Sequence, residues 1–157
     1  MAKQSPKYRV QKIVSGGQTG ADRGALDAAL SLGIEHGGWC PKGRLAEDGV
    51  IPERYSLTET SSRFYRIRTE QNVIDSDGTL IFYYKTLKGG TELTRQMAVK
   101  HDKPYLLFDV ASPSLDHIVQ QWLTTAKITV LNVAGPRESS NPGIALKVRK
   151  LLLRFLT

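Results

Sequence analysis

Short β-rich runs alternate with helical patterns along the whole chain, and this alternation constrains the fold more than any other feature. Segment 79–84 is a nearly continuous apolar run of strand length, whereas 21–32 carries alanine and leucine at helical spacing. Such alternation is typical of a parallel sheet whose two faces are covered by helices. We therefore expect a single α/β domain over residues 1–157, with three layers and a sheet of about five strands. Strands are predicted at 10–15, 38–40, 79–84, 105–108 and 128–134, and helices at 21–32, 70–76, 90–101, 114–126 and 142–155.

Residues with capping preferences set the expected helix boundaries. Gly33 is expected to close the first helix, because glycine readily takes the left-handed conformation that ends a helix. Thr69 is expected to cap the second helix. Asn141 would cap the last helix, with Pro142 at its first position.

The segment between the second and third predicted strands is the least regular. Residues 41–62 are rich in charge and breakers, which predicts a long irregular loop of the functional or flexible kind. Residues 62–68 are expected to be extended, with Arg66 and Arg68 on one face. That face would be a basic wall beside a ligand or an ordinary solvated strand, and for Arg66 we favour the second. Cys40 could touch a ligand but is more simply a small buried residue.

Composition narrows the class of protein. Lysine and arginine outnumber aspartate and glutamate by 22 to 15, a net charge of +7, which favours anionic partners or serves solubility. One cysteine excludes an intrachain disulfide and a multi-cysteine zinc site, and it fits a reducing compartment. The three histidines lack metal-ligand spacing, so no metal ligands are assigned. With no signal-peptide pattern and no run long enough to span a membrane, we expect a cytoplasmic protein.

Three polar loops follow predicted strands and lead into helices: SGGQTGADR (15–23), YKTLKGGTELT (84–94) and AGPRESSNPG (134–143). In a parallel sheet all three open on the carboxyl edge, where helix N-termini bind anions and glycine lets a phosphate come close. The loops match neither the Walker pattern nor GxGxxG, which excludes a standard ATPase or dehydrogenase. The candidate binding residues are Gly16, Gly17, Gln18, Thr19, Gly20, Asp22, Arg23, Lys88, Gly89, Gly90, Thr91, Glu92, Gly135, Pro136, Arg137 and Ser139.

Two acids in these loops have open roles. Thr19 and Asp22 have capping-box spacing, so Asp22 is expected to cap its helix, with a hydrogen bond to a ligand amine or hydroxyl as the alternative. Glu92 lies in the first turn of the next helix. It either complements the helix dipole or aims its carboxylate at a sugar, and the sequence does not decide between the two.

Several segments in order carry a family resemblance: IVSGGQTGADRGALDAAL, GWCPKGRLAEDGVIP, SDGTLIF, GGTELT and LNVAGPRES. In these the chain resembles the molybdenum carrier family, a circularly permuted relative of the lysine-decarboxylase-like (LOG and DprA, or SLOG) nucleotide-binding superfamily. The superfamily's early glycine-arginine turn resembles Gly135–Ser139, which here lies near the carboxyl terminus. Its PGGxGTxxE motif resembles Lys88–Glu92, without the proline.

The resemblance implies a Rossmann-like fold, a homo-oligomer (dimer or tetramer) and a phosphate-bearing heterocyclic ligand. For this family the ligand is the molybdenum cofactor, a pyranopterin with one phosphate, held by a carrier or storage protein. An anionic oxomolybdenum end would gain from Arg137 or Arg23. Implied partners are molybdoenzymes or cofactor-synthesis proteins.

Other functions remain open at this point. One alternative is a nucleotide hydrolase resembling the LOG phosphoribohydrolases, with Glu92 as the catalytic acid, although the altered motif weakens that transfer. Another is a sensor that binds a nucleotide-derived ligand without turnover. Nucleic-acid binding has only the net charge in its favour, so we do not expect it.

Overall fold

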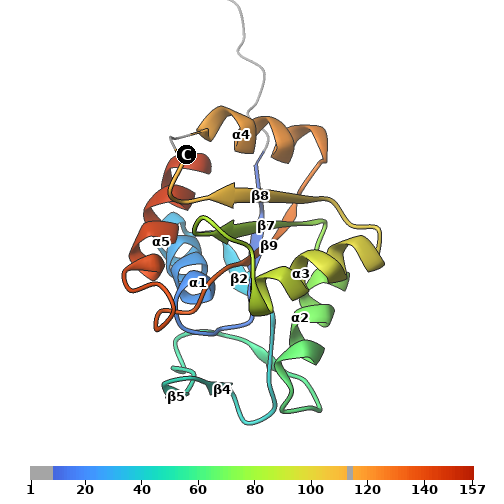
Figure 1. The fold of residues 1–157 in the computed structure, drawn as a ribbon, viewed down its shortest axis with the longest axis vertical. Coiled ribbons are helices and arrows are strands. Elements are labelled where there is room, and N and C mark those ends of the chain that lie inside the picture. Colours follow the sequence, from blue (N-terminus) through green and yellow to red (C-terminus); the bar gives the residue numbers. More distant parts are fainter. Residues whose placement is uncertain (1–8, 113–114) are drawn as a thin grey trace, which may run out of the picture.

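A five-stranded parallel sheet forms the centre of the protein (Figure 1). The structure is a computed structural model and describes residues 9–112 and 115–157. The strand order is β2–β1–β9–β7–β8, and every neighbouring pair is parallel. The strands are β1 (Lys12–Val14), β2 (Glu35–Gly37), β7 (Gly78–Tyr83), β8 (Tyr105–Asp109) and β9 (Val130–Ala134). The predicted three-layer, Rossmann-like α/β fold is confirmed.

Helices cover both faces of the sheet. The main core lies between the sheet and α1 (Ala21–Leu32), α4 (Asp116–Thr125) and α5 (Ile144–Phe155). On the other face, α2 (Tyr65–Ile74) and α3 (Gly89–Lys100) pack together. Within the described residues, the helices fall short of the length and apolar character that a membrane span requires.

The region 38–62 is more regular than expected. It holds a two-stranded parallel pair, β3 (Trp39–Cys40) with β6 (Thr58–Glu59), and a hairpin of β4 (Leu45–Ala46) with β5 (Gly49–Val50). The predicted strand 38–40 therefore exists in part, but outside the main sheet. One of the two edge strands of the main sheet is β2, which the sequence analysis missed because Glu35 and His36 give it no apolar pattern.

The expected extended stretch at 62–68 and the cap at Thr69 are wrong. Helix α2 begins at Tyr65 and contains Thr69 in its interior. The buried face of this helix carries Arg68 and Asn72, two polar residues at helical spacing, so an apolar pattern could not reveal it. Arg66 is exposed, whereas Arg68 is buried.

The predicted boundaries of α5, α4 and α1 have different outcomes. The predicted cap at Asn141 with Pro142 in the helix is wrong, because α5 begins at Ile144 after Gly143 in the left-handed conformation. The carboxylate of Glu138 instead accepts hydrogen bonds from the N–H groups of Gly143 (2.6 Å) and Ala145 (3.0 Å). The predicted start of α4 at residue 114 lies outside the described residues. The predicted close of α1 at Gly33 is confirmed.

Candidate functional site

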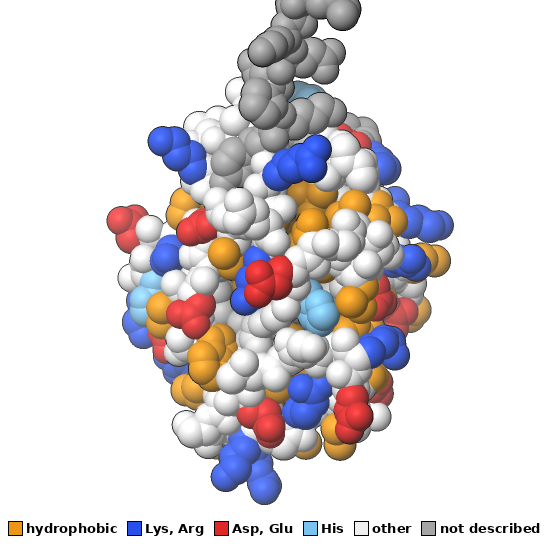
Figure 2. Space-filling model, turned by 180° about the vertical axis from the view of Figure 1, so that it is seen from behind, with side chains coloured by type: hydrophobic (Ala, Val, Ile, Leu, Met, Phe, Trp, Pro, Cys, Tyr) orange, Lys and Arg blue, Asp and Glu red, His pale blue; other side chains and the backbone are white. Residues whose placement is uncertain are grey.

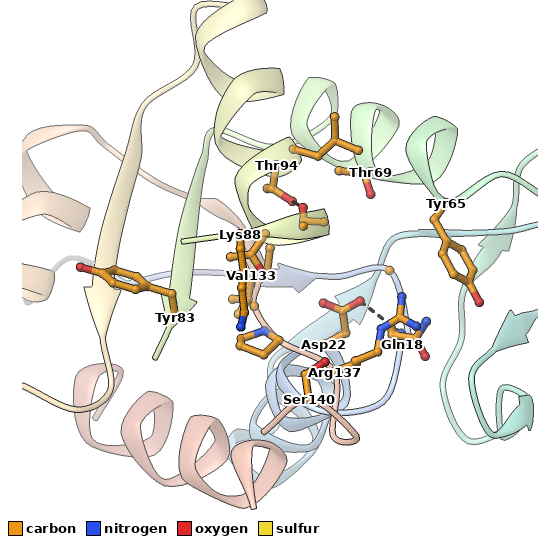
Figure 3. A pocket seen from close by; sticks show the side chains of 18 of the residues that line it. Gln18, Asp22, Tyr65, Thr69, Tyr83, Lys88, Thr94, Val133, Arg137 and Ser140 are labelled. Carbon is orange, nitrogen blue, oxygen red and sulfur yellow. Dashed lines mark hydrogen bonds between the residues drawn. The ribbon is translucent and has the colours of Figure 1, made fainter. Parts of the chain in front are cut away.

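A cavity of about 850 Å³ opens at the carboxyl edge of the sheet (Figure 3). Its lining comes from the ends of β7 and β9, from helices α2 and α3, and from the three polar loops. This volume lies within the range of pockets that hold cofactors. The edge is also where ligands bind in open parallel sheets, because the chain departs from the central strands in opposite directions there.

The cavity brings eleven of the predicted residues together. They are Gly16, Gln18, Asp22, Lys88, Gly89, Gly90, Thr91, Gly135, Pro136, Arg137 and Ser139. The other five predicted residues do not line it: Gly17, Thr19, Gly20, Arg23 and Glu92. All three loops therefore reach the cavity, although five of their predicted residues lie outside its lining.

The three helix N-termini that follow these loops differ in what they contact. The first N–H of α1, from Ala21, donates to the carbonyl of Pro136 (3.0 Å), so the third loop covers that end. The N-terminus of α5 is capped by Glu138. At α3, by contrast, the N–H groups of residues 89–91 have no acceptor within the described part of the chain. Of the three ends, this one alone leaves all of its first three N–H groups without an acceptor in that part of the chain.

Thr91 adds a side chain to the open end of α3. It is 8% exposed and lines the cavity, and its hydroxyl has no hydrogen-bond partner in residues 9–112 and 115–157. Lys88 precedes it at the helix N-cap position and carries a positive charge to the same rim. A helix dipole, free N–H groups, a hydroxyl and an ammonium group together suit a phosphate.

The glycines of the first loop lie where other parts of the chain pack closely against the backbone. A Cβ on Gly16 would lie 2.1 Å from Nη1 of Arg68, and one on Gly17 would lie 2.5 Å from Leu57. At Gly20, a Cβ would lie 2.3 Å from the carbonyl oxygen of Pro136. Each glycine thus lets another part of the chain come close. Gly90 differs, because a Cβ there would meet nothing within 4 Å.

Amide and carboxyl groups lie between the loops. Gln18 is 6% exposed; its Oε1 accepts from the N–H groups of Thr19 and Glu47, while Nε2 has no partner among the described residues. Asn132 on β9 donates to Thr79 and lines the cavity. These groups can read the hydrogen-bonding edge of a heterocycle.

Asp22 does not form the predicted capping box with Thr19. Its carboxylate accepts the N–H of Gln18 (3.1 Å) and lies 3.7 Å from Arg68. Burial raises the pKa of Asp22, and the Arg68 guanidinium opposes that shift. Asp22 lines the cavity with a carboxyl group that can accept a hydrogen bond or, when protonated, donate one.

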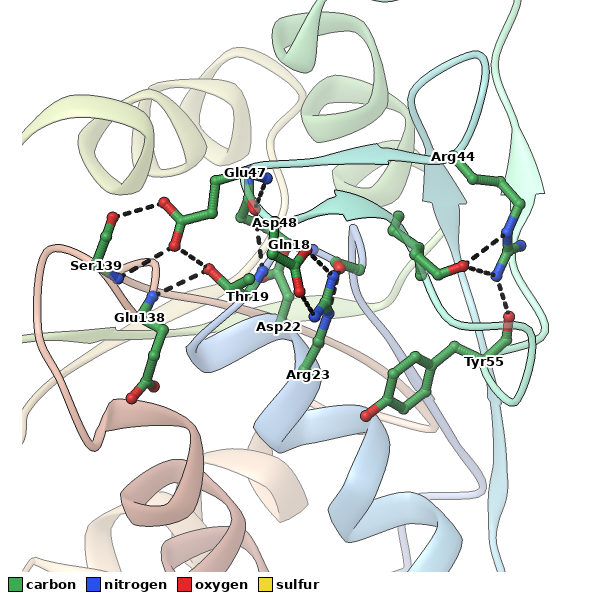
Figure 4. Close-up of polar contacts among 12 residues, drawn as sticks. Gln18, Thr19, Asp22, Arg23, Arg44, Glu47, Asp48, Tyr55, Glu138 and Ser139 are labelled. Atoms are coloured by element: carbon green, nitrogen blue, oxygen red, sulfur yellow. Dashed lines mark hydrogen bonds and ion pairs between the residues drawn. The ribbon is translucent and has the colours of Figure 1, made fainter.

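The hairpin of β4 and β5 fastens the first and third loops (Figure 4). Glu47 accepts hydrogen bonds from the hydroxyl of Thr19 and from the N–H and hydroxyl of Ser139 (3.1 and 2.6 Å). Hydrogen bonds from Ser139 and Thr19 lower the pKa of Glu47. Arg23 forms a bidentate pair with Asp48 (2.5 and 2.7 Å), so its charge is directed away from the cavity.

Glu92 is also directed elsewhere. Its carboxylate pairs with Arg95 on the same helix, at 2.9 Å and 2.5 Å, and it does not line the cavity. The Arg95 guanidinium lowers the pKa of Glu92. The placement favours a surface ion pair in the first turn of α3 over a carboxylate aimed at a ligand sugar.

Helix α2 supplies four residues that are not among the predicted binding residues, although a basic wall beside a ligand was one of the two roles left open for Arg68. Tyr65, Arg68, Thr69 and Asn72 line the cavity. The Tyr65 ring lies near two guanidinium groups, with its centroid 5.1 Å from Cζ of Arg68 and 5.7 Å from Cζ of Arg137. A helical interpretation of 65–74 would have placed Arg68 and Asn72 on one face, which is the signal that could have found them.

Away from the site, the positive charge is dispersed. On the face seen in Figure 2, lysine and arginine side chains are interspersed with aspartate and glutamate. The net charge of +7 is therefore not gathered into one basic patch on that face.

Comparison with known proteins identifies the family. No protein of curated function matches the chain. The crystal structure of a "Putative molybdenum carrier protein" from Syntrophus aciditrophicus SB is 47% identical, covers 97% of this chain and 98% of its own, and superposes with a TM-score of 0.93. The model of the circularly permutated YpsA SLOG family matches residues 13–156. The chain therefore belongs to the circularly permutated YpsA SLOG family.

Proposed function

We propose that the protein binds a phosphate-bearing heterocyclic ligand in the 850 Å³ cavity, and that this ligand is the molybdenum cofactor, which the protein carries or stores. One observation carries the proposal: of the three helix N-termini at this edge, α3 alone has all of its first three N–H groups without an acceptor in the described residues. The name of the similar protein from Syntrophus aciditrophicus supports the choice of ligand.

The residues of the cavity fit the two parts of such a ligand. The phosphate would bind the N–H groups of Gly89, Gly90 and Thr91, with Lys88 supplying the charge. The heterocycle would bind the amide and carboxyl groups of Gln18, Asp22 and Asn132. The unpartnered Nε2 of Gln18 supports this fit, because a buried donor without an acceptor costs free energy that a ligand can recover.

Binding without turnover is favoured over hydrolysis. A hydrolase of this type would use Glu92 as its acid, and a general acid at neutral pH needs a raised pKa. The pKa of Glu92 is lowered by Arg95 and its side chain lies outside the cavity lining. The neighbouring residues therefore support a carrier or a sensor more than a phosphoribohydrolase.

The remaining parts of the proposal concern assembly and location. We propose that the protein acts in the cytoplasm as a homo-oligomer and passes its ligand to molybdoenzymes or cofactor-synthesis proteins. Phe64, 77% exposed beside the cavity residue Tyr65, is a candidate contact for a second subunit.

The test is the ligand that copurifies with the protein. Protein made without oxygen in a host that synthesises molybdenum cofactor would be analysed by mass spectrometry and for molybdenum. We expect a pterin phosphate with nearly one molybdenum per chain, and a clear loss of both in Thr91→Val, which replaces the free hydroxyl with a methyl group of similar size. Ser61→Ala, an exposed hydroxyl change away from the cavity, is the control. A nucleotide without molybdenum would contradict the carrier, and release of ribose 5-phosphate abolished by Glu92→Gln would favour the hydrolase.

A further inference from the structure

Arg68 is a buried cation with unused donors on the wall of the cavity. The residue is 8% exposed; its Nη1 donates to the carbonyl of Gly16 (2.7 Å) and its Nε to the hydroxyl of Thr69 (3.2 Å). Its Nη2 has no hydrogen-bond partner among residues 9–112 and 115–157. Burying a guanidinium costs free energy unless its N–H groups have acceptors, so an acceptor bound on the cavity side of Arg68 would be stabilised.

Arg137 approaches the same place from the third loop. Both guanidinium groups lie within 6 Å of the centre of the Tyr65 ring. Their carboxylate neighbours stand beyond hydrogen-bond distance: Asp22 is 3.7 Å from Arg68, and Glu47 is 3.8 Å from Arg137. Both cations near this ring are incompletely paired, and an anion that contacted both would gain charge-assisted hydrogen bonds from each.

This end of the cavity is separate from the N-terminus of α3. In the close-up, Lys88 and Tyr65 lie on opposite sides, with Asp22 between them (Figure 3). A ligand with one anionic group would fill one end only. We propose that Arg68 and Arg137 form a second anion subsite in this cavity, and that the ligand therefore carries a second anionic group. The first anionic group is the phosphate at the N-terminus of α3, so this inference rests on the function proposed above.

The donors define the class of that second group. A guanidinium presents parallel N–H groups in a plane, which match two oxygens of an oxyanion. Two guanidinium groups from different elements offer more donors than a carboxylate can accept in one plane, and they suit a tetrahedral oxyanion of two negative charges. A phosphate ester and an oxometalate share this chemistry.

The experiment counts oxyanions bound to the full chain. Equilibrium dialysis with millimolar phosphate, and separately with molybdate, gives the number bound per chain and the affinity of each site.

The second subsite is tested with Arg68→Met, with Arg68→Lys, which keeps the charge but loses the planar group, and with Arg137→Met. Arg137 has a side chain 42% exposed, so its loss spares the packing if Arg68→Met does not fold. Arg66→Met, an exposed arginine on the same helix, is the matched control. The α3 end is tested with the double variant Lys88→Ala/Thr91→Val.

We expect two oxyanions per chain, with one site weakened about tenfold or more by each change at Arg68 or Arg137 and the other by the double variant. A single site that only the double variant removes would overturn the second subsite and leave the proposed function standing. A single site that only the arginine variants remove would uphold the second subsite and overturn the phosphate site at α3. No binding of either oxyanion would overturn both. If molybdate binds the arginine end more tightly than phosphate does, the second anionic group is an oxometalate. If phosphate binds there more tightly, the second group is a phosphate ester.

Discussion

Arg68 lies directly against the backbone of Gly16, although 52 residues separate them in the sequence. The guanidinium Nη1 donates to the carbonyl oxygen of Gly16 at 2.7 Å, and a Cβ at that position would come within 2.1 Å of the same nitrogen. A side chain at this position would force the Arg68 guanidinium to move, so the first loop and α2 position each other at the edge of the cavity.

Gly16→Ala should weaken both the fold and the anion site. The methyl group displaces the Arg68 guanidinium from its hydrogen bond, and overpacking of this kind costs about 1–3 kcal/mol. Urea unfolding measures the stability, and dialysis with molybdate measures the anion site. An alanine variant that keeps both the unfolding midpoint and the affinity of wild type would show that Arg68 need not occupy this position.

Gly90→Ala should separate stability from binding. A Cβ at Gly90 meets nothing within 4 Å, and alanine favours a helix over glycine, so the free energy of unfolding should stay the same or rise by up to about 1 kcal/mol. Occupancy by the copurified ligand should nevertheless fall, because the methyl group covers the free N–H groups of α3. Full occupancy in this variant would mean that the phosphate does not approach this end of the helix.

Much of the fold could be predicted from the sequence because the central strands are apolar and the flanking helices have small residues at regular spacing. Segment 79–84 was found for this reason, and the helix 21–32 was predicted with its observed bounds. The second half of helix α2 overlaps the predicted helix 70–76, but the edge strand β2 and residues 65–69 of α2 could not be found in this way. Their residues are polar, and their structure depends on contacts with distant parts of the chain.

The candidate site could likewise be predicted only in part. The three loops could be predicted because glycines and polar residues before helices mark the carboxyl edge of a parallel sheet. The partners of individual residues could not, because they come from elsewhere in the sequence. Arg23 donates hydrogen bonds to Asp48, and Thr19 and Ser139 donate to Glu47. Arg68 lies on helix α2, where the sequence predicts an extended segment.

Glu47→Gln should loosen the hairpin and strengthen anion binding. The hydrogen bonds that lower the pKa of Glu47 favour its charged form, so they stabilise the closed hairpin at neutral pH and are lost as the pH falls below the ordinary value of 4.5. The neutral amide imitates the acidified state and leaves Arg137 without its carboxylate neighbour. Hydrogen exchange over residues 45–50 should be faster, and molybdate should bind more tightly. Unchanged exchange would contradict the fastening role, and weaker binding would mean that Glu47 positions Arg137 for the anion.

Glu70→Gln should flatten the acid limb of the stability profile. Hydrogen bonds from Lys100 and His101 lower the pKa of Glu70 from 4.5 to about 2. A carboxylate with a lowered pKa stabilises the fold above its ordinary value and loses that contribution as the pH falls toward the lowered one. Urea midpoints of wild type should therefore decline between pH 4.5 and about 2 more steeply than those of the variant. Parallel curves for the two proteins would contradict the pairing of α2 with α3 through this residue.

Asp22→Asn tests a carboxyl group whose pKa is raised by folding, whereas folding lowers that of Glu70. Burial raises the pKa of Asp22 above 3.8, so the folded protein holds this proton more tightly than the unfolded chain does. The charged form then costs stability at any pH well above 3.8, whereas an amide can still accept the N–H of Gln18 without that cost. The variant should gain stability relative to wild type as the pH rises from below 3.8 to neutrality, measured by urea unfolding at both ends. Oxyanions should bind it more tightly, since the carboxylate 3.7 Å from Arg68 is gone. A loss of stability at neutral pH would instead mean that attraction to Arg68 outweighs the burial of Asp22.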